Sequence, residues 1–260
     1  MAKKKSASKP VKKPSRTRPA TAKSRKPAVS ARSAPSKKPT AKARLEALEK
    51  KILKDKRTMA ELRQSIPPEL VSDYAFLAHD GSKVKLSEMF GEHRDLILVH
   101  NMGRGCAYCT MWADGFTGLV KHLEDRAGFA VVSKDDVAIQ REFFQGRGWN
   151  FKMYSSVGST FNRDMGYETE KGGQQPGVSA FQRDTEGRIF RTGQTSFGPG
   201  DDFCAVWPML DLLRDGPAGW APKFEYLFPL KRGLSSSIPS LAGTGLACIP
   251  SDSRDLREKD

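Results

Sequence analysis

Residues 103–114 read Gly-Arg-Gly-Cys-Ala-Tyr-Cys-Thr-Met-Trp-Ala-Asp and follow a short apolar run, Leu96–Val99. A buried strand that leads through a glycine-rich turn into a helix opening with Cys-x-x-Cys is typical of dithiol redox sites. The N–H groups and positive dipole end of a helix N-terminus stabilise a thiolate, so Cys106 is the predicted nucleophile. Cys109 follows one turn later, where it can resolve a mixed disulfide.

The charge of the chain is concentrated in its first segment. The 260 residues carry a net charge of +14, and residues 1–44 hold 16 Lys and Arg with no Asp or Glu. This Lys/Pro/Ala/Ser tract has almost nothing to bury, so we predict that it is disordered. Such a tail can bind nucleic acid non-specifically through counterion release. A solvated extension without a dedicated partner explains the composition equally well.

The remaining chain predicts one domain between a helix and a tail. Residues 45–68 form an amphipathic helix and linker, because apolar residues recur there at intervals of three and four until Pro67. We expect this stripe to dock on the domain that follows, since Asp55 interrupts it; pairing with a second copy is the alternative. Residues 69–229 form the domain, and residues 230–260, rich in Gly, Ser and Pro, form a disordered tail.

Within the domain, strand and helix patterns alternate before the topology changes. Apolar periodicity and turn residues predict a first hairpin, a βαβα succession with a parallel sheet, and then an antiparallel hairpin and a last helix. The expected elements are a hairpin at 74–90, strands at 95–100, 129–133 and 151–155, helices through 116–123, 135–144 and 203–213, and a hairpin at 178–191.

This succession resembles the thioredoxin fold in its peroxiredoxin-like, hairpin-bearing form. Residues 105–116 are similar to the signature of a bacterial thioredoxin-like family catalogued as domain of unknown function eight-nine-nine. Further matches are Gly148-Trp149, Ser155-Ser156-x-Gly158-Ser159-x-Phe161-Asn162 and Phe181-x-Arg183-Asp184. The resemblance covers roughly residues 45–226 and implies an α/β, three-layer thioredoxin-like fold with a central mixed sheet, but no settled substrate.

Two departures from the family pattern surround the cysteines. Family members commonly have a longer loop before them, and a proline where this chain has Ala107. Residues between and around the cysteines tune the redox potential of the pair, so the direction of the reaction stays open.

Three further residues are candidates for the chemistry at the cysteines. His100 lies where thioredoxins place a buried acid that handles a proton of the second cysteine, and a core histidine is the alternative. Pro176 stands where thioredoxins have a cis-proline that exposes backbone to the substrate, and a plain loop proline is the alternative. Arg104 is either a charge that lowers the pKa of Cys106 or a solvated loop residue. Tyr108, between the cysteines, is a further candidate for substrate contact.

A zinc site and a covalently attached haem are the alternatives to a redox-active cysteine pair. The spacing Cys106-x2-Cys109-x12-His122 supplies three ligands of a zinc finger, but no His or Cys follows at the required interval. Covalent haem attachment needs a His where Thr110 stands. We therefore predict neither a metal nor a cofactor.

These observations predict a thiol–disulfide oxidoreductase that acts on a protein or small-molecule substrate. A thiol peroxidase is one alternative, although Val99 and Gly103 occupy the positions where its Pro and Thr or Ser are expected. A redox-inert module delivered to nucleic acid by the basic tail is the other. The four cysteines fit a reducing cytoplasm better than a secreted protein, and no stretch is apolar enough to span a membrane.

Overall fold

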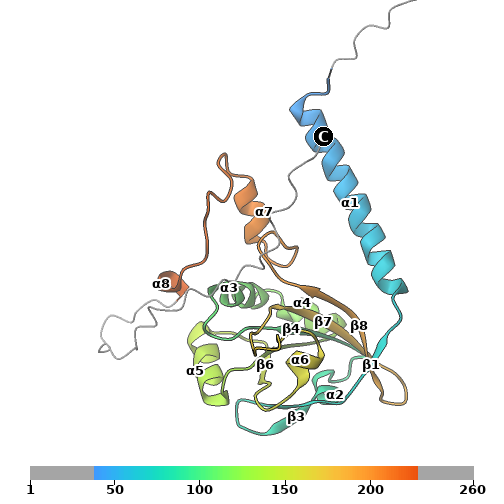
Figure 1. The fold of residues 1–260 in the computed structure, drawn as a ribbon, viewed down its shortest axis with the longest axis vertical. Coiled ribbons are helices and arrows are strands. Elements are labelled where there is room, and N and C mark those ends of the chain that lie inside the picture. Colours follow the sequence, from blue (N-terminus) through green and yellow to red (C-terminus); the bar gives the residue numbers. More distant parts are fainter. Residues whose placement is uncertain (1–37, 228–260) are drawn as a thin grey trace, which may run out of the picture. The chain divides into compact units, whose positions relative to one another are not determined.

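The computed structural model describes residues 38–227 (Figure 1). These residues belong to two compact units, and the boundary between the units along the chain lies between Lys51 and Ile52. The predicted disordered tails are residues 1–44 and 230–260, and they lie outside the described part except for residues 38–44. Of these, residues 41–44 are helical, contrary to the prediction. None of the helices within residues 38–227 combines the length and apolar character that a membrane crossing requires.

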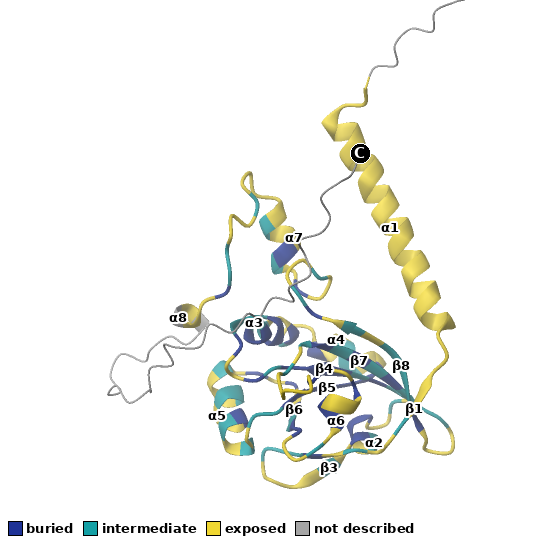
Figure 2. Ribbon diagram, viewed as in Figure 1, coloured by how far each residue is buried: buried dark blue, intermediate teal, exposed yellow. Residues whose placement is uncertain are grey.

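Helix α1 (Ala41–Ser65) confirms the predicted amphipathic helix but begins four residues before Leu45. Its first turn is closed by the hydroxyl of Thr40, which accepts the Ala43 N–H at 3.2 Å. No residue of α1 is buried, as the exposed colour along the helix in Figure 2 shows. The expected docking of its apolar stripe on the domain stays a prediction.

Eight strands form one mixed sheet in the order β1-β8-β7-β4-β5-β6-β2-β3. At its centre β4 runs parallel to β5 and antiparallel to β7, and β5 runs parallel to β6. The strands are β1 (Glu69–Val71), β2 (Ala75–Leu77), β3 (Lys83–Lys85), β4 (Asp95–His100), β5 (Gly128–Ser133), β6 (Lys152–Ser155), β7 (Gly177–Arg183) and β8 (Ile189–Ser196).

Helices cover both faces of this sheet, which gives the three layers of the thioredoxin-like fold (Figure 1). The parallel βαβ core, the antiparallel β7–β8 pair after it and the helix that follows confirm the predicted α/β class. The helices of the domain are α2 (Leu86–Met89), α3 (Ala107–Phe116), α4 (Val120–Arg126), α5 (Val137–Arg147), α6 (Phe161–Asp164), α7 (Val206–Asp211) and α8 (Phe224–Leu227).

Two hydrophobic cores lie on the two sides of the sheet, and β4 contributes to both. Val99 packs with α3 and α4 in the first core, which also holds Cys106 and Cys109. Leu96 and Leu98 pack in the second core. Alternate residues of a strand point to opposite faces, so this continuous apolar run is buried on both sides, as predicted.

Several element boundaries differ from the expected ones. The helix expected through residues 116–123 is two helices, because the chain turns at residues 117–119 between α3 and α4. The side chain of Asp136, rather than that of Asp135, caps α5 by accepting the Ala138 N–H at 2.9 Å. The helix expected at residues 203–213 is α7, which is only six residues long; Trp207 on it is buried, whereas Leu213 beyond its end is exposed.

Candidate active site at the start of α3

The two cysteines of the Cys-x-x-Cys stretch lie at the first turn of α3, and both are buried. Cys106 is the N-cap residue, and its sulfur accepts the Cys109 N–H at 3.2 Å. The sulfur of Cys109 accepts the Met102 N–H at 3.4 Å. A sulfur that accepts backbone N–H groups at a helix N-terminus is stabilised as a thiolate, so the geometry supports the predicted roles.

Asn101 holds the start of the loop between β4 and α3. Its side-chain oxygen accepts the Gly103 N–H at 2.8 Å, and its amide group donates to the carbonyl oxygen of Cys109 at 3.3 Å. Asn101 is itself buried, with 6% of its surface exposed. One side chain thus ties the loop to the helix that carries both cysteines. No periodicity or motif in the sequence indicates this role of Asn101.

Asp135, at the end of β5, holds the middle of the same loop. Its carboxylate accepts the Arg104 N–H at 2.9 Å and the Ser133 hydroxyl at 3.3 Å. Gly103 has a φ of +94°, and a Cβ there would lie 2.5 Å from Asp135 Oδ1. Burial raises the pKa of Asp135, although the hydrogen bonds and the charge of Arg104 oppose this. The sequence predicts only the start of a helix at residue 135, and that signal does not indicate a contact with the cysteine loop.

Serine residues that match the family pattern support the turn that contains Asp135. The Ser155 hydroxyl donates to the Asp135 carbonyl oxygen at 2.5 Å, and the Ser156 hydroxyl donates to the Ser133 carbonyl oxygen at 3.2 Å. Gln140, which is buried, donates to the Ser133 hydroxyl at 2.9 Å. Ser155 and Ser156 therefore position the backbone of the turn between β5 and α5.

The neighbouring residue, Lys134, ties the same turn to the loop that precedes Pro176. Its ammonium group pairs with Glu168 at 2.5 Å, and this hydrogen bond lowers the pKa of Glu168. Glu168 also forms an isolated antiparallel bridge with Gln174. The turn between β5 and α5 thus contacts the cysteine loop through Asp135 and the proline loop through Lys134.

Pro176 lies at the same end of the sheet as the cysteine loop. It precedes β7, whose first residue, Gly177, pairs with His100 at the end of β4. The Pro176 carbonyl oxygen accepts the Phe197 N–H at 3.0 Å. A Cβ at Gly177 would clash with the Tyr167 ring, so only glycine fits after this proline. The structure thus brings the predicted proline to the end of the sheet that carries the cysteines.

His100 points away from the cysteines, to the other face of the sheet. Its ring stacks on Tyr167, with centroids 3.6 Å apart, and on Phe161, both of which belong to the second core. Its Nε2 atom lies 2.9 Å from the hydroxyl of Ser179. Burial, with a smaller effect from the charge of Arg191, holds the pKa of His100 well below its usual 6.5. The structure therefore does not support the predicted proton relay.

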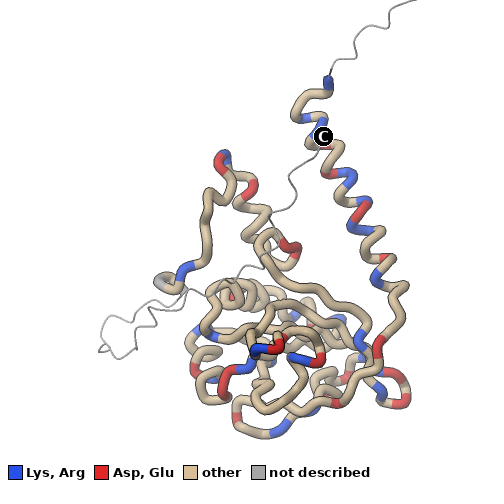
Figure 3. The backbone as a smooth tube through the Cα atoms, viewed as in Figure 1, with Lys and Arg blue, Asp and Glu red and all other residues tan. Residues whose placement is uncertain are grey.

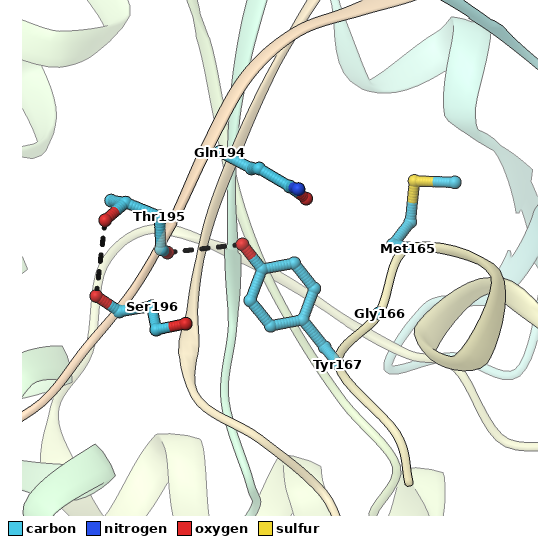
Figure 4. Close-up of a pocket in the computed structure, with 6 residues that line it drawn as sticks. All are labelled: Met165, Gly166, Tyr167, Gln194, Thr195 and Ser196. Carbon is cyan, nitrogen blue, oxygen red and sulfur yellow. Dashed lines mark hydrogen bonds between the residues drawn. The ribbon is translucent and has the colours of Figure 1, made fainter. Parts of the chain in front are cut away.

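Figure 4 shows the residues that line a cavity beside Tyr167. The volume of this cavity is about 260 Å³. It lies between residues 165–167 and 194–196, and the Tyr167 hydroxyl donates to the Thr195 carbonyl oxygen at 3.2 Å. None of the predicted site residues contributes to its wall. This cavity is therefore separate from the cysteine site.

Helix α3 is largely apolar and carries little charge. Tyr108 is half-buried, with its ring centroid 6.1 Å from Trp112 and 6.2 Å from Trp207. The only charged residue of α3 is Asp114, so the helix is nearly free of charge in Figure 3. Asp114 accepts hydrogen bonds from Arg147 and from the Trp149 indole, which neutralise it. Arg104, whose side chain is exposed, supplies the positive charge nearest in sequence to Cys106.

The zinc alternative receives no support from the positions of its ligands. His122 is exposed on α4, whereas both cysteines are buried. Across residues 38–227, no group of three or more His, Cys, Asp or Glu side chains is arranged to hold a metal ion. Cys204 lies in the same core as the two cysteines, and burial raises the pKa of its thiol, as is typical of a packing cysteine.

Comparison with protein families gives a match over most of the chain. The family described as "Bacterial protein of unknown function (DUF899)" matches residues 30–223. The chain belongs to this family. The resemblance predicted from the cysteine signature is thus confirmed. A search of curated proteins found no match.

Solved structures similar to this DUF899 protein are peroxiredoxins of low sequence identity. Peroxidoxin BcpB from Mycobacterium tuberculosis is 21% identical, with a TM-score of 0.42 over 50% of this chain and 84% of that one. A peroxiredoxin-like protein from Aquifex aeolicus is 14% identical, with a TM-score of 0.40 over 50% and 74%. The mitochondrial 2-cys peroxiredoxin from Plasmodium falciparum is 14% identical, with a TM-score of 0.40 over 51% and 83%.

Proposed function

We propose that this DUF899 protein is a thiol–disulfide oxidoreductase in which Cys106 attacks and Cys109 resolves. The observation that carries the proposal is the hydrogen bond at 3.2 Å from the Cys109 N–H to the sulfur of Cys106 at the N-cap of α3. This contact joins the two ends of the Cys-x-x-Cys stretch at a helix terminus. It supports a thiolate at Cys106, which is the species that reacts with disulfides.

The reaction proceeds through two exchanges of sulfur. The Cys106 thiolate attacks one sulfur of a substrate disulfide, the second substrate sulfur leaves as a thiolate, and a mixed disulfide forms. The Cys109 thiolate then attacks the Cys106 sulfur, releases the first substrate thiolate and closes a Cys106–Cys109 disulfide. Two electrons pass to the substrate, and an external dithiol restores the pair. Run in reverse, the same steps oxidise a substrate dithiol.

The site surface suits a disulfide that lies within an apolar segment. Tyr108 contributes aromatic surface beside the cysteines, and Pro176 lies at the same end of the sheet. Arg104 offers a positive charge to an anionic substrate group. The reaction fits a reducing compartment such as the cytoplasm, where an external dithiol is at hand. The peroxidase alternative is weaker, because Val99 and Gly103 stand where its Pro and its Thr or Ser are expected.

Reduction of insulin by dithiothreitol, with the full chain as catalyst, tests the proposal. We expect Cys106→Ser to remove the catalysed rate, and Cys109→Ser to accumulate a mixed disulfide that mass spectrometry detects. Cys204→Ser is the matched control, because Cys204 is buried in the same core but does not belong to the Cys-x-x-Cys stretch at the start of α3, and it should retain the rate. Catalysis that survives Cys106→Ser would refute the proposal. Consumption of peroxide that depends on Cys106, without insulin reduction, would favour the peroxidase.

A further inference from the structure

Helix α1 carries a row of exposed apolar side chains along one face, which we call the seam. The seam residues alternate at intervals of three and four, which gives the average spacing of 3.5 that coiled coils require. No residue of α1 is buried. The apolar members of the seam are Leu45, Leu48, Ile52, Met59, Leu62 and Ile66, which follows the helix, and their exposed fractions are 56, 53, 43, 39, 62 and 61%.

A seam of this kind indicates a second helix as its partner. Apart from Leu53, the large apolar side chains of α1 occupy a and d positions of a heptad, and this stripe is narrower than the face that packs on a globular core. We propose that α1 pairs with α1 of a second copy of this chain in an antiparallel two-stranded coiled coil. Two-fold pairing of identical surfaces is the commonest route to a dimer. This proposal is independent of the dithiol chemistry.

Asp55 determines the direction of the pairing. It occupies a d position of the heptads that begin at Leu45. In a parallel pair the two Asp55 carboxylates would face each other in the seam, where like charges repel and desolvation is costly. In the antiparallel pair Asp55 instead faces Ile52 of the other copy. The other layers match Ala41 with Ile66, Leu45 with Leu62 and Leu48 with Met59, so all of them are apolar.

Charge complementarity along one edge of the seam supports the same arrangement. Glu49 and Lys56 both occupy e positions, so antiparallel pairing places Glu49 of each copy beside Lys56 of the other. Lys56 already pairs with Asp202 of its own chain at 2.6 Å, but an ammonium group has three donors and can serve both carboxylates. Like charges meet only where Lys42 faces Arg63 near the helix ends, both of which are exposed.

Sedimentation equilibrium of the full chain between about 5 and 200 µM tests the dimer. We expect a monomer–dimer equilibrium, and Ile52→Glu should raise the dissociation constant at least about tenfold by placing a charge in the seam. Leu53→Glu is the matched control, because Leu53 is as exposed, at 59%, but lies off the seam, and it should leave the equilibrium unchanged. Circular dichroism checks that both variants fold. A monomer over the whole range, or equal effects of the two variants, would overturn the proposal.

Charge reversal tests the direction of the helices. In the antiparallel pair, Glu49→Lys and Lys56→Glu should each weaken the homodimer about tenfold, and an equimolar mixture of the two variants should form heterodimers. In a parallel pair Lys51 faces residue 56 of the other helix, so Lys56→Glu alone would tighten the dimer. That result would overturn the antiparallel arrangement.

Discussion

The absence of a side chain at Gly103 allows the cysteine loop to pack against Asp135. The loop bends there with a φ of +94°, and a Cβ would lie 2.5 Å from the Asp135 carboxylate. The next residue, Arg104, donates its backbone N–H to the same carboxylate. Glycine therefore fixes the path by which the chain enters α3 and the position of Cys106 at its start.

Gly103→Ala should lower the free energy of unfolding by about 1–3 kcal/mol, because the alanine must adopt a left-handed conformation and displace Asp135. Urea denaturation measures this loss, and alkylation rates of Cys106 report the displaced loop. Gly105→Ala is the control, since no atom lies within 4 Å of its Cβ position and its φ is not positive. Equal stability of the two variants would show that Asp135 does not restrain the loop.

His100 should make the stability of the fold depend on pH. Burial, with a smaller effect of Arg191, keeps the pKa of its ring well below 6.5 in the folded state. Above pH 6.5 the ring is neutral in both states. As the pH falls below 6.5, the unfolded chain binds a proton that the folded chain excludes, so the free energy of unfolding falls by up to about 1.4 kcal/mol per pH unit.

Urea denaturation between about pH 7.5 and 5.5 measures this slope, and His100→Gln should remove the part that His100 contributes. The comparison is needed because burial also lowers the pKa of His79, which adds a slope of the same sign. Identical slopes for the wild type and the variant would mean that the His100 ring titrates normally in the fold.

At the scale of elements, the central strands and the Cys-x-x-Cys helix could be predicted from sequence, because each has a local signal. The run of apolar residues in β4 and the glycines before α3 are such signals. The face that His100 occupies could not be predicted, because both faces of β4 are buried and the run shows no alternation. A spacing of six residues from Cys106 therefore could not show that His100 belongs to the second core.

Residues that act through long-range contacts were missed for a related reason. Asp135 is distant from Arg104 in sequence, and the residues Ser133-Lys134-Asp135-Asp136 carry the composition of any helix start. The helix predicted at residues 203–213 ends earlier in the structure, at Asp211. Leu210 and Leu213 continue the apolar periodicity of a helix, but Leu213 is exposed and does not pack on the core. Apolar periodicity identifies one face of a helix, but it does not show which other element packs on that face.

The contact between α3 and α5 illustrates how one element positions another. Arg147 of α5 donates two hydrogen bonds to Asp114 of α3, and both side chains are partly buried. Arg147→Gln should lower the free energy of unfolding by about 1–3 kcal/mol, because it leaves the Asp114 carboxylate without its charged partner. Arg126→Gln, which breaks an exposed ion pair with Asp95, should cost less than about 1 kcal/mol. Thermal and urea denaturation compare the two variants. Equal losses of unfolding free energy would show that the Arg147–Asp114 pair stabilises the fold no more than an exposed ion pair does.

At the scale of the whole molecule, charge divides the chain into two parts. Residues 1–37 contain 13 of the 44 Lys and Arg and no acidic residue, whereas residues 38–260 have 31 basic and 30 acidic residues. A nearly neutral domain has little attraction for polyanions at long range. Any affinity for nucleic acid should therefore reside in the first segment.

The full chain should bind a labelled DNA duplex and heparin alike, with a logarithmic salt slope of about −5 or steeper, because Lys and Arg release counterions from either polymer. Fluorescence anisotropy at several salt concentrations measures the slope. Deletion of residues 1–37 should abolish binding while insulin reduction, which needs only Cys106 and Cys109, continues at the same rate. Binding that survives the deletion would place the affinity in the domain. A preference for one DNA sequence over heparin would indicate base contacts, which a segment without aromatic residues does not predict.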